Sequence, residues 1–241
     1  MDRLLDKPEN VLQFSGGKDS LACLHLLRID PGWDNLLVVW MNAGDPWPQT
    51  ITQMREIATQ VPHFCEVKAD VMAHREVFGH PSDLISMVNT LQGQTFRGKT
   101  KITVQSWIQC CGANIWGPLD SFMREVIKPK RVYRGQRKEE LYTSLIVSGA
   151  VVNGIEYILP LQDWTTKDVD KFLIENQIQI PEGYKFSDKS LDCLHCTAYL
   201  EERKAQMAWL KLQGGKVWKK VSGDLEEIKE VALEQLKNLD V

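Results

Sequence analysis

Four of the six cysteines have the spacing of metal ligands. Cys110 and Cys111 are adjacent, and Cys193 and Cys196 form a Cys-x-x-Cys turn much farther along the chain. Such a turn offers two thiolates to one metal centre, and an adjacent pair from elsewhere can complete a four-thiolate site. Zinc and an iron-sulfur cluster both suit four sulfur ligands. A disulfide network is a third interpretation, which a cytosolic location disfavours.

A second group of chemically active residues is Ser15-Gly16-Gly17-Lys18-Asp19-Ser20, near the N-terminus. The segment follows a short apolar run and leads into a helical pattern, and open α/β sheets bind ligands at such strand-to-helix turns. The two glycines allow close backbone approach, and the start of a helix presents N–H groups and a positive dipole end. The serine hydroxyls and the lysine add donors for an anion. We therefore expect a phosphate-binding loop, although its spacing is not that of the Walker loop.

The elements that must position these groups follow from the alternation of short apolar runs with amphipathic segments. This alternation predicts an α/β fold with a mostly parallel sheet flanked by helices. The expected strands are residues 11–14, 36–42, 64–67, 131–134 and 156–161. The expected helices are residues 19–28, 48–60 and 166–176, the last with Thr165 or Thr166 as its N-cap. Residues 71–104 give mixed signals.

From Leu200 onward, apolar residues recur at helical spacing between charged ones. We expect a helical C-terminal tail that Gly214-Gly215 and Gly223 break into two or three helices. The predicted domains are a nucleotide-binding domain over residues 1–200, which includes the four spaced cysteines, and a docked helical appendage over residues 201–241.

The composition is that of an ordinary globular protein: 241 residues, 43% hydrophobic, 25% charged, net charge -3. This excludes collagen-like, coiled-coil and wholly disordered chains, and it provides no global basic field for polyanions. No signal peptide or spanning segment is evident, so we expect a cytoplasmic protein without a membrane partner. Six basic residues form a local group that is either a solvated face or a phosphate-rich rim: Lys128, Lys130, Arg131, Arg134, Arg137 and Lys138.

The loop at residues 15–20 resembles the phosphate-binding loop (PP-loop) of the adenine nucleotide α-hydrolase superfamily. That superfamily includes N-type ATP pyrophosphatases and phosphoadenosine-phosphosulfate (PAPS) reductases. Residues 42–50, 135–140 and 159–169 resemble three further family motifs in the family's order, although Gln49 stands where the family carries Glu. The resemblance implies a Rossmann-like fold and catalytic roles for Lys18, Asp19 and Arg137. It also implies an adenine nucleotide site formed by Ser15, Gly16, Gly17, Lys18, Asp19, Ser20, Asn42, Gly44, Gly135 and Arg137.

The cysteine pattern resembles that of the [4Fe-4S] adenosine-phosphosulfate (APS) reductases, which implies that Cys110, Cys111, Cys193 and Cys196 hold a [4Fe-4S] cluster rather than zinc. The chain departs from that pattern at two places. Asn114 and Ile115 stand where the family carries Arg-Lys. Residues 197–241 contain no cysteine, whereas the reductases carry a nucleophilic cysteine in a C-terminal Glu-Cys-Gly-Leu segment. The two other thiols, Cys23 and Cys65, are predicted to be structural.

Together these features predict a PAPS reductase-like enzyme of sulfur metabolism that binds ATP, with Mg²⁺, and a [4Fe-4S] cluster. It would adenylylate an acceptor with loss of pyrophosphate and let sulfur displace AMP. The acceptor would be a nucleic acid or a small molecule, and a partner protein would donate sulfur or electrons. One alternative is a reductase that forms sulfite from APS or PAPS. Another is a non-catalytic nucleotide-binding iron-sulfur subunit.

Overall fold

The computed structural model describes residues 8–82, 89–98, 101–140, 146–187 and 191–237. The chain divides into two compact units, each made of three separate stretches. The sheet unit comprises Met1–Asn42, Pro48–Val67 and Pro118–Lys185, and the cysteine unit comprises Ala43–Trp47, Lys68–Gly117 and Phe186–Val241. The boundary suggested after residue 200 is a different division of the chain and stays a prediction.

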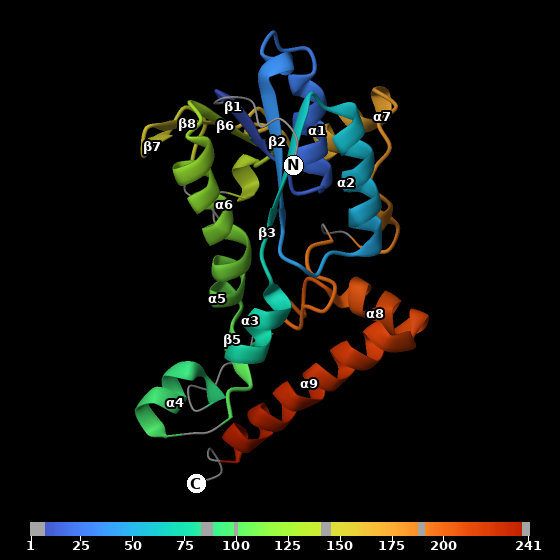
Figure 1. Ribbon diagram of the computed structural model, residues 1–241. Helices are drawn as coiled ribbons and strands as arrows, with labels where there is room; N and C mark the ends of the chain where they lie inside the picture. Colours follow the sequence, from blue (N-terminus) through green and yellow to red (C-terminus); the bar gives the residue numbers. More distant parts are fainter. Residues whose placement is uncertain (1–7, 83–88, 99–100, 141–145, 188–190, 238–241) are drawn as a thin grey trace. The chain divides into compact units, whose positions relative to one another are not determined.

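Six strands form the sheet of the sheet unit, in the order β3-β2-β1-β6-β8-β7 (Figure 1). β1 is parallel to both of its neighbours, and β8 is parallel to β6. β7 pairs antiparallel with β8 at one edge. The mostly parallel sheet predicted from the sequence is therefore confirmed. The strands are β1 (Asn10–Gln13), β2 (Leu36–Asn42), β3 (His63–Lys68), β6 (Arg131–Arg134), β7 (Val151–Val152) and β8 (Ile155–Ile158).

Both faces of this sheet are covered, because successive side chains of a strand point to opposite faces. Leu12 of β1 belongs to one buried core, which includes residues of α1, α2 and α7. Val11 belongs to the other core, together with Met123 and Ile127 from the helical run that precedes β6. Figure 1 shows α1, α2 and α7 together on one side of the strands. A central strand that is apolar on both faces is typical of parallel sheets.

The helices of the sheet unit are α1 (Lys18–Leu27), α2 (Pro48–Gln60) and α7 (Thr166–Glu175). α2 begins at a proline, which lacks the N–H that the first helical position leaves unpaired. Thr165 is the N-cap of α7: its backbone N–H donates to the Asp168 carboxylate at 2.8 Å, and its hydroxyl accepts from the Asp168 N–H. This reciprocal capping box fixes the start of the helix. Short 3₁₀ turns span Trp33–Asn35, Lys138–Glu140 and Glu182–Lys185.

The cysteine unit contains a separate sheet of two parallel strands, β4 (His80–Ser82) and β5 (Val104–Ser106). α3 (Val71–Phe78) precedes β4, and α4 (Leu91–Arg97) lies between the strands in the sequence. β5 leads directly into α5 (Trp107–Cys111) and a π turn (Gly112–Trp116). The chain continues into the sheet unit as α6 (Gly117–Ser121) and a second π turn (Phe122–Ile127). Strands of only three residues are too short to give a period in the sequence, which explains the mixed signals over residues 71–104.

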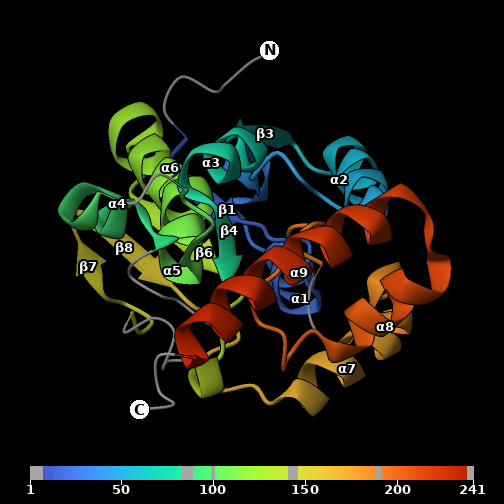
Figure 2. The same cartoon turned by 90° about the horizontal axis from the view of Figure 1, so that it is seen from below.

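The C-terminal tail forms two helices, α8 (Lys204–Gln213) and α9 (Gly215–Leu236), separated at Gly214. Helices at this end confirm the predicted tail, but the expected interruption at Gly223 is wrong, and Figure 2 shows α9 as one continuous helix. A glycine inside a helix costs only about 1 kcal/mol relative to alanine. The buried side chains of Val221, Ile228 and Val231 outweigh that cost. Over the described parts of the chain, no helix has the length and apolar character needed to cross a membrane.

Candidate functional site

The loop at residues 15–20 lies where open α/β sheets bind ligands. It follows β1, and residues 135–137 follow β6, the parallel neighbour of β1. β2 lies on one side of β1 and β6 on the other, so connections leave this point in opposite directions. Such a topological switch point, outside the carboxyl ends of the strands, is the usual ligand site of this architecture. The fold therefore places two of the predicted nucleotide segments at the carboxyl ends of two neighbouring strands, β1 and β6 (Figure 1).

The loop is held in shape by its own hydrogen bonds. Gly16 has a φ of +85°, and a Cβ there would lie 2.5 Å from a side chain of α2. The Gln53 amide donates to the Gly16 carbonyl at 2.9 Å, and the Ser20 hydroxyl donates to the Gly17 carbonyl at 2.8 Å. Gly17, the N-cap of α1, has no side chain to cap the helix. The Lys18 N–H donates to the Tyr184 hydroxyl at 3.2 Å, and the first turn of α1 begins at the loop, where a helix start favours an anion.

Gly135 marks a close backbone approach between the end of β6 and the start of α1. A Cβ at this position would lie 2.6 Å from the Asp19 carbonyl oxygen and 2.7 Å from the Ser20 nitrogen. Glycine alone fits such a contact without backbone movement. The structure thus places Gly135 at the first turn of α1, and its role in nucleotide binding stays a prediction.

Each cation predicted to face the nucleotide has a carboxylate partner in the sheet unit. The Lys18 Nζ lies 2.6 Å from the Asp170 Oδ1, and the Arg137 Nε lies 3.1 Å from the Asp19 Oδ2. The same guanidinium donates to the Thr166 hydroxyl at 2.8 Å and to the Glu139 carboxylate at 2.9 Å. The Arg137 side chain is only 9% exposed. A phosphate group that binds at this loop must therefore compete with internal carboxylates.

The two remaining residues of the predicted nucleotide site belong to different units. Asn42 ends β2 in the sheet unit and donates to the Glu66 carboxylate at 2.6 Å. Gly44 lies in the cysteine unit, where its φ is +96° and a Cβ would lie 2.6 Å from the Ala69 carbonyl oxygen. Their roles as nucleotide ligands stay predictions.

Half of the basic group at residues 128–138, Lys130, Arg131 and Arg137, is ion-paired. Lys130 pairs with Glu9, and the Arg131 Nε lies 2.8 Å from the Glu156 carboxylate. The Arg134 guanidinium lies 4.7 Å from the centre of the Tyr157 ring. These contacts favour the interpretation of a solvated, internally paired face over a free phosphate-binding rim.

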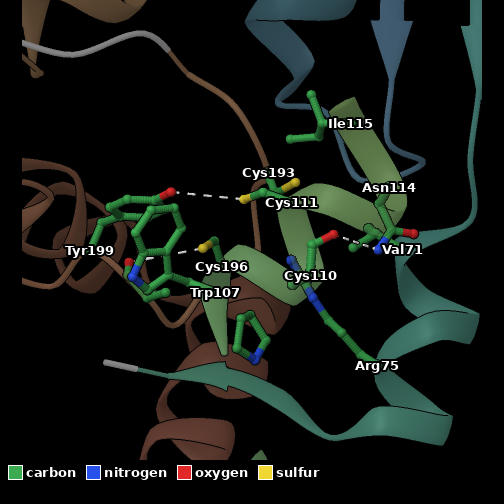
Figure 3. A pocket seen from close by; sticks show the side chains of 12 residues that line it. Val71, Arg75, Trp107, Cys110, Cys111, Asn114, Ile115, Cys193, Cys196 and Tyr199 are labelled. Carbon is green, nitrogen blue, oxygen red and sulfur yellow. Dashed lines mark hydrogen bonds between the residues drawn. The ribbon is translucent and has the colours of Figure 1, made fainter. Parts of the chain in front are cut away.

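The four spaced cysteines line a single pocket inside the cysteine unit (Figure 3). Trp107 and Tyr199 form an aromatic wall, with their ring centres 4.7 Å apart. Trp116 contacts Trp107 edge-on and is half exposed. The lining is otherwise apolar except for three residues that carry polar groups, Arg75, Asn114 and the Tyr199 hydroxyl.

A π turn follows the adjacent cysteine pair and alters the local backbone hydrogen bonds. Cys110 is buried at the end of α5, and the Asn114 side chain donates to the Cys110 carbonyl at 2.8 Å. A π turn shifts the bonding from i→i−4 to i→i−5 and frees a carbonyl that a side chain can satisfy. Asn114, which stands where the related reductases carry arginine, thus helps to fix the backbone of the cysteine pair.

The Cys-x-x-Cys turn is held through its backbone carbonyls. The Arg203 guanidinium donates to the Cys193 and Cys196 carbonyls, both at 3.0 Å. Pro46 forms an isolated antiparallel bridge with Cys193, and the Leu194 N–H donates to the Asp45 carbonyl at 2.7 Å. Three sequence segments therefore determine where these two sulfurs lie.

A buried ion-pair network adjoins this turn. The Asp45 carboxylate accepts from the His195 Nδ1 at 2.7 Å and from the His195 backbone N–H at 2.9 Å. The Arg75 guanidinium donates to the same carboxylate at 3.1 Å and to the His195 carbonyl at 3.2 Å. The pKa of Asp45 is lowered even though burial opposes this, because His195 and Arg75 stabilise its ionised form. Asp45 is thus a permanent anion in this network.

Burial favours the protonated form of three pocket thiols, Cys110, Cys111 and Cys193. It raises the pKa of Cys111 to about 12 and that of Cys193 well above 9. It also raises the pKa of Cys110, where the positive charge of Arg75 acts in the opposite direction. Burial raises the pKa of Tyr199 as well, and Cys111 adds to the effect. A metal that binds here must displace the thiol protons, as thiolate ligation requires.

Four thiols around one pocket are a ligand set that a single ion or a cluster can use. Tetrahedral zinc needs its ligands about 2.0–2.3 Å from one point. Among the described residues, no three His, Cys, Asp or Glu side chains are placed to hold one ion. A [4Fe-4S] cluster is instead surrounded by four thiolates. Four cysteines around one pocket supply the number of ligands that such a cluster takes, and the choice of a cluster over zinc stays a prediction.

Arg75, Asp45 and His195 are candidate functional residues that the sequence analysis did not single out. Arg75 and Val71 are four residues apart on α3, and both are buried. An arginine on the apolar side of a short helix was the available signal, because arginine is rarely buried without a partner. Asp45 and His195 carried no such signal, because their contact joins residues far apart in the sequence.

The fold and the two sites define an α/β protein with a strand-to-helix loop suited to phosphate and a pocket of four thiols. Residues 9–199 match the family model of the phosphoadenosine phosphosulfate reductase domain. Because the match covers well over half of the 241 residues, the chain belongs to this family, a nucleotide-binding family of sulfur metabolism. The family resemblance found in the sequence is therefore confirmed. A comparison with curated protein sequences returns no match.

Solved structures with a similar fold include the PAPS reductase of Candida auris in a phosphate complex, at 18% identity and a TM-score of 0.50. The alignment covers 77% of this chain and 82% of that chain. The FMN adenylyltransferase of Candida glabrata in complex with ATP matches at 16% identity and a TM-score of 0.48, over 77% of this chain and 53% of that chain. This chain thus spans about half the length of the adenylyltransferase. At 18% identity, the reductase shows a shared fold.

Proposed function

We propose that the protein is an ATP-dependent sulfurtransferase that adenylylates an acceptor at the loop of the sheet unit and holds a [4Fe-4S] cluster in the cysteine pocket. We favour a transferase over a reductase because neither of the two thiols outside the pocket is activated as a thiolate. Burial raises the pKa of Cys23 to about 12 and also raises that of Cys65. A sulfonyl-attacking nucleophile must be a thiolate, and neither thiol is activated as one.

This observation has a direct chemical test. Iodoacetamide at pH 8 should label Cys23 and Cys65 much more slowly in the folded protein than in the unfolded chain, because burial hinders access and a raised pKa lowers the fraction of thiolate. Peptide mass spectrometry after brief exposure measures the labelling of each cysteine, and the unfolded chain gives the labelling of a fully accessible thiol. Rapid labelling of either thiol in the folded protein would reopen the reductase mechanism.

The loop supplies the groups that adenylylation needs. Lys18 and Arg137 would meet the phosphates in place of Asp170 and Asp19, and the start of α1 would add backbone donors. Mg²⁺ is commonly held by one or two carboxylates together with substrate phosphates. Asp19 and Asp170, once released from these cations, are the carboxylates at the loop that suit such an ion.

The proposed reaction balances without a redox step. An acceptor oxygen attacks the α-phosphorus of ATP, the new P–O bond forms, and the bond to the β-phosphate breaks as pyrophosphate leaves. Hydrosulfide then attacks the acceptor carbon, forms the C–S bond and releases AMP with the former acceptor oxygen. Lys18 and Arg137 would stabilise charge on the phosphates in the first step and on AMP in the second.

The cysteine pocket would hold the cluster through Cys110, Cys111, Cys193 and Cys196. When bound, a [4Fe-4S] cluster supplies one-electron redox capacity at a potential that its surroundings set. Trp107 and Tyr199 would exclude water from its apolar side. The partners that this scheme requires are an acceptor, which would be a nucleic acid or a small molecule, and a protein that donates hydrosulfide.

An anaerobic assay with ATP, APS and PAPS tests the proposal by following pyrophosphate, AMP and sulfite. Pyrophosphate formed from ATP, increased by an RNA or DNA acceptor and hydrosulfide, is the expected result. The overall cysteine framework favours one second candidate, a reductase of APS or PAPS. Sulfite from either compound would establish that alternative and exclude the transferase. Nucleotide binding without any product would instead indicate a non-catalytic subunit.

A further inference from the structure

Arg75 is the one cationic side chain among the described residues that line the cysteine pocket. It reaches the pocket from α3, and Figure 3 shows its guanidinium directed toward Cys110. Its side chain is 6% exposed, so water screens its charge poorly. A buried arginine is costly unless its charge and its donors are matched. The pocket must therefore contain, or be built to receive, groups that match it.

The protein itself matches this guanidinium only in part. One terminal nitrogen donates to the Asp45 carboxylate at 3.1 Å and to the His195 carbonyl at 3.2 Å. Asp45 also accepts two hydrogen bonds from His195, so its negative charge is shared between two partners. The Arg75 Nε is buried and has no hydrogen-bond partner among the described residues. A donor is thus left over on the residue that forms the wall of the pocket.

The unpaired donor and the four thiols suggest the same kind of occupant. The positive charge of Arg75 acts on Cys193, Cys196 and Cys110, and would stabilise each as a thiolate. A cluster ligated by four thiolates carries net negative charge, which would match the guanidinium. The residues that follow the paired cysteines, Asn114 and Ile115, are both neutral and cannot supply this charge.

We infer that Arg75 is the positioning residue and internal counter-charge of the cluster, held at the pocket wall by Asp45 and His195. This inference rests on the proposed function, because it assumes that the four cysteines hold a cluster. Arg75 would act on the cluster through its charge and its donors, while Asp45 would fix the guanidinium and partly offset its charge. Removing the charge of Arg75 and removing that of Asp45 should therefore shift the midpoint potential of the cluster in opposite directions.

The test compares Arg75→Gln, Arg75→Lys and Asp45→Asn with the unchanged chain, all purified anaerobically as full-length protein. Iron per chain and visible absorbance measure cluster retention, and an anaerobic redox titration followed by electron paramagnetic resonance measures the midpoint potential. Loss of a nearby positive charge disfavours the more negative reduced form, so Arg75→Gln should shift the potential to more negative values. Arg75→Lys keeps the positive charge, so its potential should stay close to that of the unchanged chain. Asp45→Asn should shift the potential to more positive values.

Lys204→Gln is the matched control, because it removes the same formal charge from a side chain of this unit that is 70% exposed. Its potential should equal that of the unchanged chain, since exposed charges are screened. A cluster with the same potential in Arg75→Gln and in the unchanged chain would overturn the inference and leave the proposed function intact. If both Arg75 variants lose their iron, the Asp45→Asn potential decides: a positive shift supports the inference and an unchanged value overturns it. An unchanged chain that holds zinc or no metal overturns the cluster itself.

Discussion

Lys18 at the loop of the sheet unit and Arg75 at the pocket of the cysteine unit have different kinds of carboxylate partner. Lys18 pairs with Asp170, a carboxylate that is 42% exposed, so a ligand can replace that partner at modest cost. Arg75 pairs with Asp45, which is 6% exposed and also accepts two hydrogen bonds from His195. The first arrangement suits a ligand that binds and leaves, whereas the second suits a resident group. The contrast fits a nucleotide at the loop and a cluster in the pocket.

The largest expected effect is that of Cys193→Ser on the pocket. Serine cannot replace a thiolate ligand, so the variant should lose most of its iron and its visible absorbance. Its thermal midpoint should also fall, because the metal ties together segments that are far apart in the sequence. Cys65→Ser, which changes a thiol of the sheet unit, should keep its iron. Unchanged iron content in Cys193→Ser would refute the ligand assignment.

Lys18→Ala tests whether the loop works independently of the pocket. A charge-assisted hydrogen bond contributes about 1.5–3 kcal/mol, so ATP affinity should fall roughly 10- to 100-fold. Iron content and the visible spectrum should not change. Calorimetric titration with a non-hydrolysable ATP analogue measures the affinity, with Lys130→Ala, an exposed residue paired with Glu9, as the control. Loss of iron in Lys18→Ala would contradict the assignment of separate roles to the two sites.

The two sites also differ in how far the sequence predicts them. Residues 15–20 form a continuous motif after a strand, so strand, loop and helix could each be inferred from local pattern, and β2 and α2 match their predicted limits. The pocket is assembled from α3, β4, α5, the π turn after α5 and the loop that carries the Cys-x-x-Cys turn. The sequence predicts its cysteines but not Arg75. Arg75 lies in a segment without a clear period, and its partner Asp45 lies 30 residues away, so only the fold reveals that they meet. At Gly223 the local pattern was misleading: the glycine predicts an interruption, but the packing of buried side chains keeps α9 continuous.

Gly135→Ala tests the close approach that joins the two segments of the loop site. The added Cβ would meet backbone atoms at 2.6 Å, so we expect a loss of about 1–3 kcal/mol in the free energy of unfolding. ATP affinity should fall with it, because the first turn of α1 must shift. Gly223→Ala is the contrasting variant: its Cβ would enter open space inside a helix, and it should stabilise the chain by up to about 1 kcal/mol. Chemical denaturation measures both, and an unaffected Gly135→Ala protein would refute the contact.

The smallest expected effect is that of Asp170→Asn, which removes the carboxylate that competes with phosphate for Lys18. The Lys18 Nζ lies 2.6 Å from this carboxylate, so the variant should bind a metal-free ATP analogue a few-fold more tightly, most clearly at low ionic strength. Asp163→Asn removes the same formal charge from an exposed position and should leave the affinity unchanged. If Asp170 also helps to hold Mg²⁺, the gain should vanish or reverse when Mg²⁺ is added. Weaker binding without Mg²⁺ would mean that Asp170 orients Lys18 toward the ligand rather than competing for it, and the loop cation would then be held in place as firmly as Arg75.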